Sequence, residues 1–177
     1  MKFTKDNWIT KGVELLNSEG SHAFNIDRMC SRLKITKGSF YHYFDGIDEF
    51  TLLVVKHWSK NALKQLDEIN SSGKSSEARL NLLTDHFFQQ TGKRELGLRN
   101  MSLENRSVKS LVDGVTKKRT DSLKQVITGY GVSGQRAQAM ARLIHDAWLG
   151  ILVSGIDNIK DRDQTLSALT DLVMRKV

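Results

Sequence analysis

The fold of this chain is decided by the stretch from Asn25 to Phe44, which reads NIDRMCSRLKITKGSFYHYF. Ile26, Met29 and Leu33 recur at the spacing that places side chains on one face of an α-helix. Asn25 stands just before this face and is a residue type that caps helix N-termini. The pattern therefore predicts a short helix that begins after Asn25 and buries one apolar face.

A second short helix is expected after a tight turn formed by Lys34, Ile35 and Thr36. Thr36 can cap this helix, because its side-chain oxygen can accept a hydrogen bond from a first-turn N–H group that lacks a partner. Phe40 and Phe44 are one helical turn apart and are expected to be buried together. The side chains left on the outer face are polar or aromatic, namely Lys37, Ser39, Tyr41, His42 and Tyr43.

This outer face has the chemistry of a DNA contact. A lysine can reach a phosphate or a guanine edge, a serine can bond to either, and tyrosine hydroxyls and imidazoles can donate to phosphate. Helix-turn-helix proteins place the start of their second helix in the major groove in this way. We expect DNA contacts from Asn25, Arg28, Thr36, Lys37, Gly38, Ser39, Tyr41, His42 and Tyr43.

The segment from Thr36 to Phe44, TKGSFYHYF, closely resembles the recognition helix of TetR-type (TetR/AcrR-like) transcriptional regulators, usually S/T-x-G-T/S-hydrophobic-Y-x-H/Y-F. The similarity covers residues 1 to about 50 and includes the segment from Trp8 to Leu16 and the turn glycine Gly20. Lys34 and Ile47 differ from the family, which often has glycine at the first position and a phosphate-contacting lysine at the second. A left-handed turn at Lys34 would carry a penalty of about 1 kcal/mol or more.

The resemblance implies a regulator of transcription. TetR-type proteins are homodimers that bind double-stranded DNA at an inverted-repeat operator and are released from it by a small molecule. We therefore expect a repressor of this kind, with an apolar or amphipathic effector.

The composition agrees with an all-helical chain that has a polyanionic partner. The chain has 177 residues, 39% of them hydrophobic, no proline and a net charge of +7. The absence of proline suits an all-α fold, and the positive charge favours nucleic acid. The basic run Lys117-Lys118-Arg119 lies far from the predicted DNA helix and is interpreted as a solvated helix face rather than a second DNA contact.

The location expected from the sequence is the cytoplasm. A single cysteine, Cys30, excludes an internal disulfide and suits a reducing compartment. It is interpreted as a small buried residue, with a redox-sensing thiol as the alternative. We expect no signal peptide and no membrane association, since the start of the chain is polar and no apolar run is long enough to span a bilayer.

Two domains are expected. Residues 1–46 would form the helix-turn-helix DNA-binding domain, and residues 47–177 a helical ligand-binding and dimerisation domain, with a long helix at 47–69 connecting the two. The remaining helices are expected at residues 5–18, 77–91, 93–104, 108–128, 135–155 and 162–176, with Gly92 ending the one before it.

The second domain is expected to hold the effector and the dimer interface. Aromatic, methionine and histidine side chains suggest a pocket of Trp58, His86, Phe87, Met101, His145 and Trp148. The last two helices present apolar stripes that could form half of a four-helix interface, with Met140, Ile144, Trp148, Ile151, Leu166, Leu169, Leu172 and Val173 as contacts. The alternative for both sets is the core of the chain itself.

Other classes of function find less support. We expect no enzyme, because the sequence shows no glycine-rich phosphate loop, nucleophile elbow or carboxylate pair in a defined context. No cofactor is expected, and no histidine spacing suggests a metal site. A helical interaction module without sequence-specific DNA binding stays open as the alternative, because Ile47 replaces the family's lysine.

Overall fold

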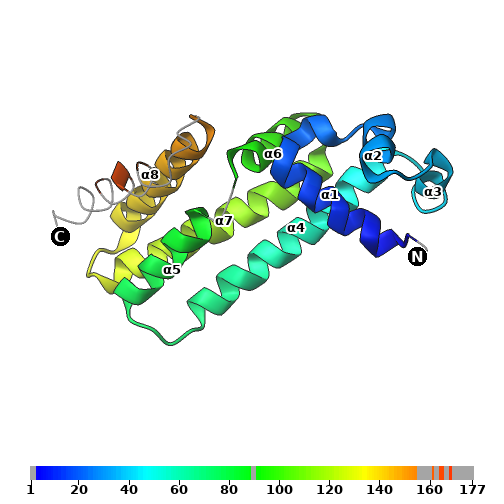
Figure 1. Cartoon of the computed structure of the whole chain (residues 1–177). Helices are drawn as coiled ribbons and strands as arrows, with labels where there is room; N and C mark the ends of the chain where they lie inside the picture. The colour runs from blue at the N-terminus through cyan, green and yellow to red at the C-terminus, as the bar shows by residue number, and fades with distance from the viewer. Residues whose placement is uncertain (1–2, 89–90, 155–160, 162–163, 166–167, 169–177) are drawn as a thin grey trace. The chain divides into compact units, whose positions relative to one another are not determined.

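The computed structural model describes residues 3–88 and 91–154 together with residues 161, 164, 165 and 168. All regular structure in these residues is helical, which confirms the all-α class (Figure 1). The helices are α1 (Lys5–Glu19), the 3₁₀ turn η1 (Gly20–Ala23), α2 (Ile26–Leu33), α3 (Lys37–Tyr41), α4 (Ile47–Asn70), α5 (Ser76–Phe88), α6 (Gly92–Glu104), α7 (Arg106–Gly129) and α8 (Gly134–Val153).

Two details of the helix prediction need correction. Helix α5 ends at Phe88, and Gly92 begins α6 instead of ending the helix before it. The expected helix at residues 162–176 falls almost entirely outside the described residues. No helix in the described part of the chain is long and apolar enough to cross a membrane.

The chain divides into two compact units. The first unit comprises residues 1–62 and 93–113, and the second comprises residues 63–92 and 114–177. Helices α4 and α7 each contribute residues to both units. The expected boundary between residues 46 and 47 separates DNA-binding from effector-binding functions and stays a prediction.

The core of the first unit is built around Trp8. This side chain is fully buried, and the rings of Phe40, Phe44 and Phe50 meet it edge-on with centroid distances of 5.4, 6.4 and 6.1 Å. Edge-to-face aromatic pairs contribute about 0.5–1.5 kcal/mol each beyond the area they bury. A single tryptophan of α1 therefore fixes the inner faces of both α3 and α4.

Cys30 lies in the same core. Its burial, followed by the nearby Asp27 carboxylate, raises the pKa of its thiol. A raised pKa lowers the fraction of reactive thiolate, so the structure favours the small buried residue over the redox sensor.

The start signals of α2 and α3 are present as the sequence predicts. Asn25 Oδ1 accepts a hydrogen bond from the Arg28 N–H at 3.1 Å, and Thr36 Oγ1 accepts one from the Ser39 N–H at 3.4 Å. Each cap satisfies a first-turn donor that the helix itself leaves without a partner. The first cap marks the start of α2, and the second marks the end of the turn between α2 and α3.

Helix α6 packs against η1 at a point with no room for side chains. A Cβ atom on Gly97 would lie 2.6 Å from the backbone nitrogen of Ser21 and 3.0 Å from the Cα of Gly20. Next to this contact, Arg94 Nη1 donates a hydrogen bond to Asn17 Oδ1 of α1 at 3.0 Å. The first unit therefore joins α6 to the end of α1 by direct backbone packing.

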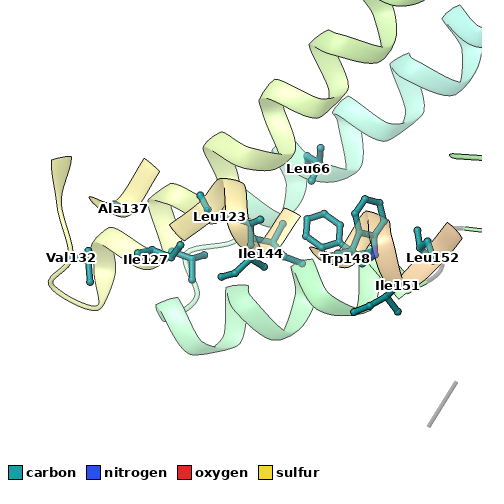
Figure 2. Close-up of a cluster of buried hydrophobic side chains, with 13 residues drawn as sticks. Leu66, Leu123, Ile127, Val132, Ala137, Ile144, Trp148, Ile151 and Leu152 are labelled. Carbon is teal, nitrogen blue, oxygen red and sulfur yellow. The ribbon is translucent and has the colours of Figure 1, made fainter. Parts of the chain in front are cut away.

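The core of the second unit is formed by α5, α7 and α8, together with Leu66 of α4 (Figure 2). Trp148 is fully buried and its ring lies 4.7 Å from that of Phe87. The other side chains are aliphatic, namely Leu66, Leu83, Leu123, Val126, Ile127, Val132, Ala137, Ala141, Ile144, Ile151 and Leu152.

The turn between α2 and α3 carries a removable strain. Lys34 adopts the left-handed conformation, with φ 54° and ψ 43°, where a β-carbon is unfavourable. We expect Lys34→Gly to raise the free energy of unfolding by about 1 kcal/mol, as measured by urea denaturation. Lys64→Gly is the matched control, because Lys64 is an exposed residue in the middle of α4. Glycine at that position should lower the free energy of unfolding by about 1 kcal/mol. A Lys34→Gly protein no more stable than wild type would contradict the prediction.

Candidate nucleic-acid interface

Helix α3 is divided into a buried and an exposed side. Phe40 is completely buried, whereas Tyr41 is 57% exposed, and Lys37 and His42 are also exposed. Ser39 is half-buried, as is Tyr43, which follows the helix. The sequence-predicted outer face is therefore outside in the structure, while its contact with DNA stays a prediction.

Gly38 lies on the exposed side and leaves room for an approaching surface. A Cβ atom at this position would come near only one atom, Thr36 Oγ1 at 3.9 Å, so packing within the protein does not require glycine. The sequence prediction of a DNA contact at Gly38 is compatible with this open space, because a helix N-terminus without a side chain can come closer to phosphate.

Shallow hollows flank α3 on both sides. One, of about 270 Å³, is lined by Phe24, Asn25, Ile26, Asp27, Lys37, Tyr41 and Ile47. The other, of about 440 Å³, is lined by Phe3, Thr36, Gly38, Ser39, His42 and Tyr43. All the predicted DNA contacts except Arg28 line one of these hollows, so the structure brings them together around one short helix.

Ion pairs modify the charge of this surface, and sequence reasoning missed them. Lys37 Nζ contacts Asp27 Oδ1, and this hydrogen bond and charge raise the pKa of Lys37. Glu19 at the end of α1 binds two arginines of α2, with Arg28 Nη2 and Arg32 Nη2 each 2.7 Å from one of its oxygens. No sequence spacing indicates the Glu19 pairs, since α1 meets α2 only in the folded unit.

Ile47 takes a packing role where the family has a lysine. Its side chain is half-buried and packs against the core that contains Trp8 and Phe44. Isoleucine carries no charge, so this position cannot make the ionic phosphate contact of the family's lysine. Any electrostatic attraction to DNA must therefore come from other residues of the unit.

The predicted pocket residues fall into two groups. Trp58 and Met101 are buried in the first unit, and the other four lie in the second. The ring centroid of His86 lies 6.0 Å from that of Phe87, which in turn is 4.7 Å from Trp148. The fourth residue, His145, is 5.6 Å from Trp148. The four residues of the second unit therefore form one cluster.

Arg119 is a member of this cluster that the sequence analysis misplaced. Its guanidinium carbon lies 4.9 Å from the centre of the Trp148 ring, and the residue is only 1% exposed. The interpretation of Lys117-Lys118-Arg119 as a solvated face is thus wrong for Arg119. Lys117 is exposed and pairs with Asp121, whereas Lys118 is half-buried and pairs with Asp67.

The predicted dimer contacts on α8 mostly serve the core of the second unit. Ile144, Trp148 and Ile151 are buried there, and Met140 is half-buried. The remaining predicted contacts, Leu166, Leu169, Leu172 and Val173, lie outside the described residues. The outer side of α8 instead presents Leu143, which is exposed, together with Ala147 and Gly150.

The comparisons with known proteins agree with this arrangement. Residues 9–52 match the family model of bacterial regulatory proteins of the tetR family. Transcriptional regulator AcuR of Cereibacter sphaeroides is 31% identical over 77 residues, which are 43% of this chain and 35% of that protein. The match thus spans about a third of the length of that relative.

Solved structures share the fold along nearly the whole chain. A TetR transcriptional regulator from Legionella pneumophila superposes with a TM-score of 0.73 at 14% identity, over 98% of this chain and 97% of the other. The regulatory protein TetR from Rhodobacter sphaeroides gives 0.69 at 20% identity, over 95% of each chain. Residues 9–52 therefore resemble the N-terminal segment of the tetR family of bacterial regulatory proteins, and the chain as a whole shares the fold of solved TetR regulators.

Proposed function

We propose that the protein is a ligand-responsive transcriptional repressor that binds an inverted-repeat operator as a homodimer and leaves it when a small molecule binds. The observation that carries the proposal is the division of α3, with Phe40 fully buried and Lys37, Tyr41 and His42 exposed around Gly38. This is the arrangement by which helix-turn-helix proteins present a short helix to the major groove.

A homodimer would supply the symmetry that an inverted repeat requires. Two reading helices would have to lie about 34–36 Å apart to enter successive major grooves on one side of a duplex. The outer side of α8 supports self-association, because Leu143 is exposed and Ala147 and Gly150 beside it are small enough for close helix packing.

The second unit holds the best candidate for an effector site. His86, Phe87, His145 and Trp148 bring aromatic rings and polar ring nitrogens together, and Arg119 adds a buried charge. Such a mixture suits an amphipathic small molecule. The effector would act in the cytoplasm and would release DNA only if it binds the free and DNA-bound states with different affinity.

Lys37→Ala tests the phosphate contact. The variant is expected to weaken binding to all duplexes and to reduce the slope of log affinity against log salt by about one unit. Lys64→Ala removes the same charge from the exposed side of α4 and should leave the slope unchanged. Fluorescence anisotropy with a labelled duplex at several salt concentrations measures both slopes. If the Lys37→Ala slope equals that of wild type, Lys37 does not contact phosphate.

Selection of bound DNA from a random pool tests the class and symmetry of the regulator. We expect enrichment of an inverted repeat whose half-sites are centred about one helical turn apart. Repeating the selection with Ser39→Ala should change base preference within each half-site, because this side chain can reach base edges. A pool without enrichment would favour the helical interaction module over the repressor.

A further inference from the structure

Both charged residues among the predicted DNA contacts are already paired with a carboxylate of their own unit. Lys37 contacts Asp27, and Arg28 Nη2 lies 2.7 Å from Glu19 Oε2. A chain with a net charge of +7 thus presents a DNA-reading region in which the positive charge is partly cancelled.

The two acids differ in what they do for the fold. The Glu19 side chain is only 13% exposed and binds Arg28 and Arg32 together, so it joins the end of α1 to α2. The side chains of Asp27 and Lys37 are 69% and 59% exposed, and exposed ion pairs of this kind contribute little to stability. The contact between Asp27 and Lys37 is therefore not needed to hold the helices together.

The position of the Asp27–Lys37 pair is what gives it a role. Asp27 lies in the first turn of α2, Lys37 is the first residue of α3, and both line the hollow that also contains Asn25 and Tyr41. The carboxylate of Asp27 thus occupies the place beside the ammonium that a phosphate oxygen would take. Carboxylate and phosphate make the same charge-assisted hydrogen bonds with an ammonium, so the two compete.

We propose that Asp27 competes with DNA phosphate for Lys37. This competition lowers the affinity for non-specific duplexes, in which α3 is not fully inserted into the major groove. The inference rests on the proposed contact between α3 and DNA. In a loose, non-specific complex the Lys37 ammonium is shared between Asp27 and the phosphates, so its contact with the duplex is weakened. In the specific complex the inserted helix brings a phosphate or a base edge to Lys37. This new contact replaces the one between Lys37 and Asp27. Asp27 therefore raises the ratio of specific to non-specific affinity.

A double-mutant cycle on non-specific DNA tests this competition. Affinity for a random-sequence duplex is measured by fluorescence anisotropy for wild type, Asp27→Asn, Lys37→Ala and the double variant. We expect Asp27→Asn to raise the affinity about threefold to tenfold when Lys37 is present, and less than about 1.5-fold when it is alanine. Asp27→Ser repeats the measurement with a second side chain that suits a first helical turn.

Asp45→Asn is the matched control, since Asp45 is an exposed acid of the same unit and its loss changes the net charge equally. An equal gain from Asp45→Asn, or an equal gain from Asp27→Asn with and without Lys37, would show a general charge effect and overturn the inference. A titration of the lysine ammonium groups by NMR without DNA checks the pair itself: the pKa of Lys37 must fall in Asp27→Asn. A wild-type protein that binds no duplex would contradict the proposed function, and the inference with it.

Discussion

The variant Trp8→Ala is expected to lose about 3–5 kcal/mol of unfolding free energy and, with it, measurable DNA binding at ambient temperature. Trp8 is fully buried, and its ring contacts those of Phe40, Phe44 and Phe50. Removing it leaves a cavity beneath α3 that the surrounding helices cannot fill without moving. Because α3 buries only Phe40, its orientation depends on this one surface.

Urea denaturation followed by tryptophan fluorescence and circular dichroism measures the loss in Trp8→Ala. Tyr41→Ala provides the matched control, since it removes an aromatic ring from the exposed side of the same helix and should change stability by less than about 0.5 kcal/mol. A Trp8→Ala protein within about 1 kcal/mol of wild type would mean that this core does not hold α3 in place.

Gly97→Ala is expected to destabilise the first unit by about 1–3 kcal/mol, because the added methyl group meets backbone atoms that cannot rotate away. The nearest are the nitrogen of Ser21 at 2.6 Å and the Cα of Gly20 at 3.0 Å. Either α6 moves away from η1 or the end of α1 shifts. A second expected result is weaker DNA binding, since the end of α1 carries Glu19, which holds Arg28 on α2.

Thermal unfolding and anisotropy measure both effects of Gly97→Ala. Gly114→Ala serves as the control, because Gly114 lies inside α7 and a Cβ there meets nothing within 4 Å. Alanine favours helix over glycine by about 1 kcal/mol, so Gly114→Ala should stabilise the protein. Opposite signs for the two glycine substitutions are the expected result, and equal signs would contradict the close packing of α6 on η1.

The helix-turn-helix segment from Asn25 to Phe44 could be predicted from the sequence because its signals are local. The caps Asn25 and Thr36, the spacing of Ile26, Met29 and Leu33, and the pair Phe40 and Phe44 act within a few residues of the chain. Such signals act in any tertiary setting, and the structure contains both predicted helices of this segment, α2 and α3, with their predicted caps.

What could not be predicted depends on contacts between distant segments. Glu19 lies nine residues before Arg28, and only the angle between α1 and α2 brings the two together. In sequence Arg119 is one of three consecutive basic residues. Its position on α7, one residue after Lys118, turns its side chain toward the core, where it lies over Trp148. Ile144 and Ile151 have the pattern of an exposed apolar stripe, and only the packing of α5 and α7 shows that the core already covers them.

The buried thiol of Cys30 offers a direct measure of how often the first unit opens. The chain contains no other cysteine, and this one lies on the buried side of α2 among the core side chains around Trp8. A thiol reagent can reach it only when the first unit loosens, so the labelling rate in native buffer reports the free energy of that opening. Following the rate as operator DNA is added would show how far binding rigidifies the domain, without a label on the DNA or a second probe on the protein.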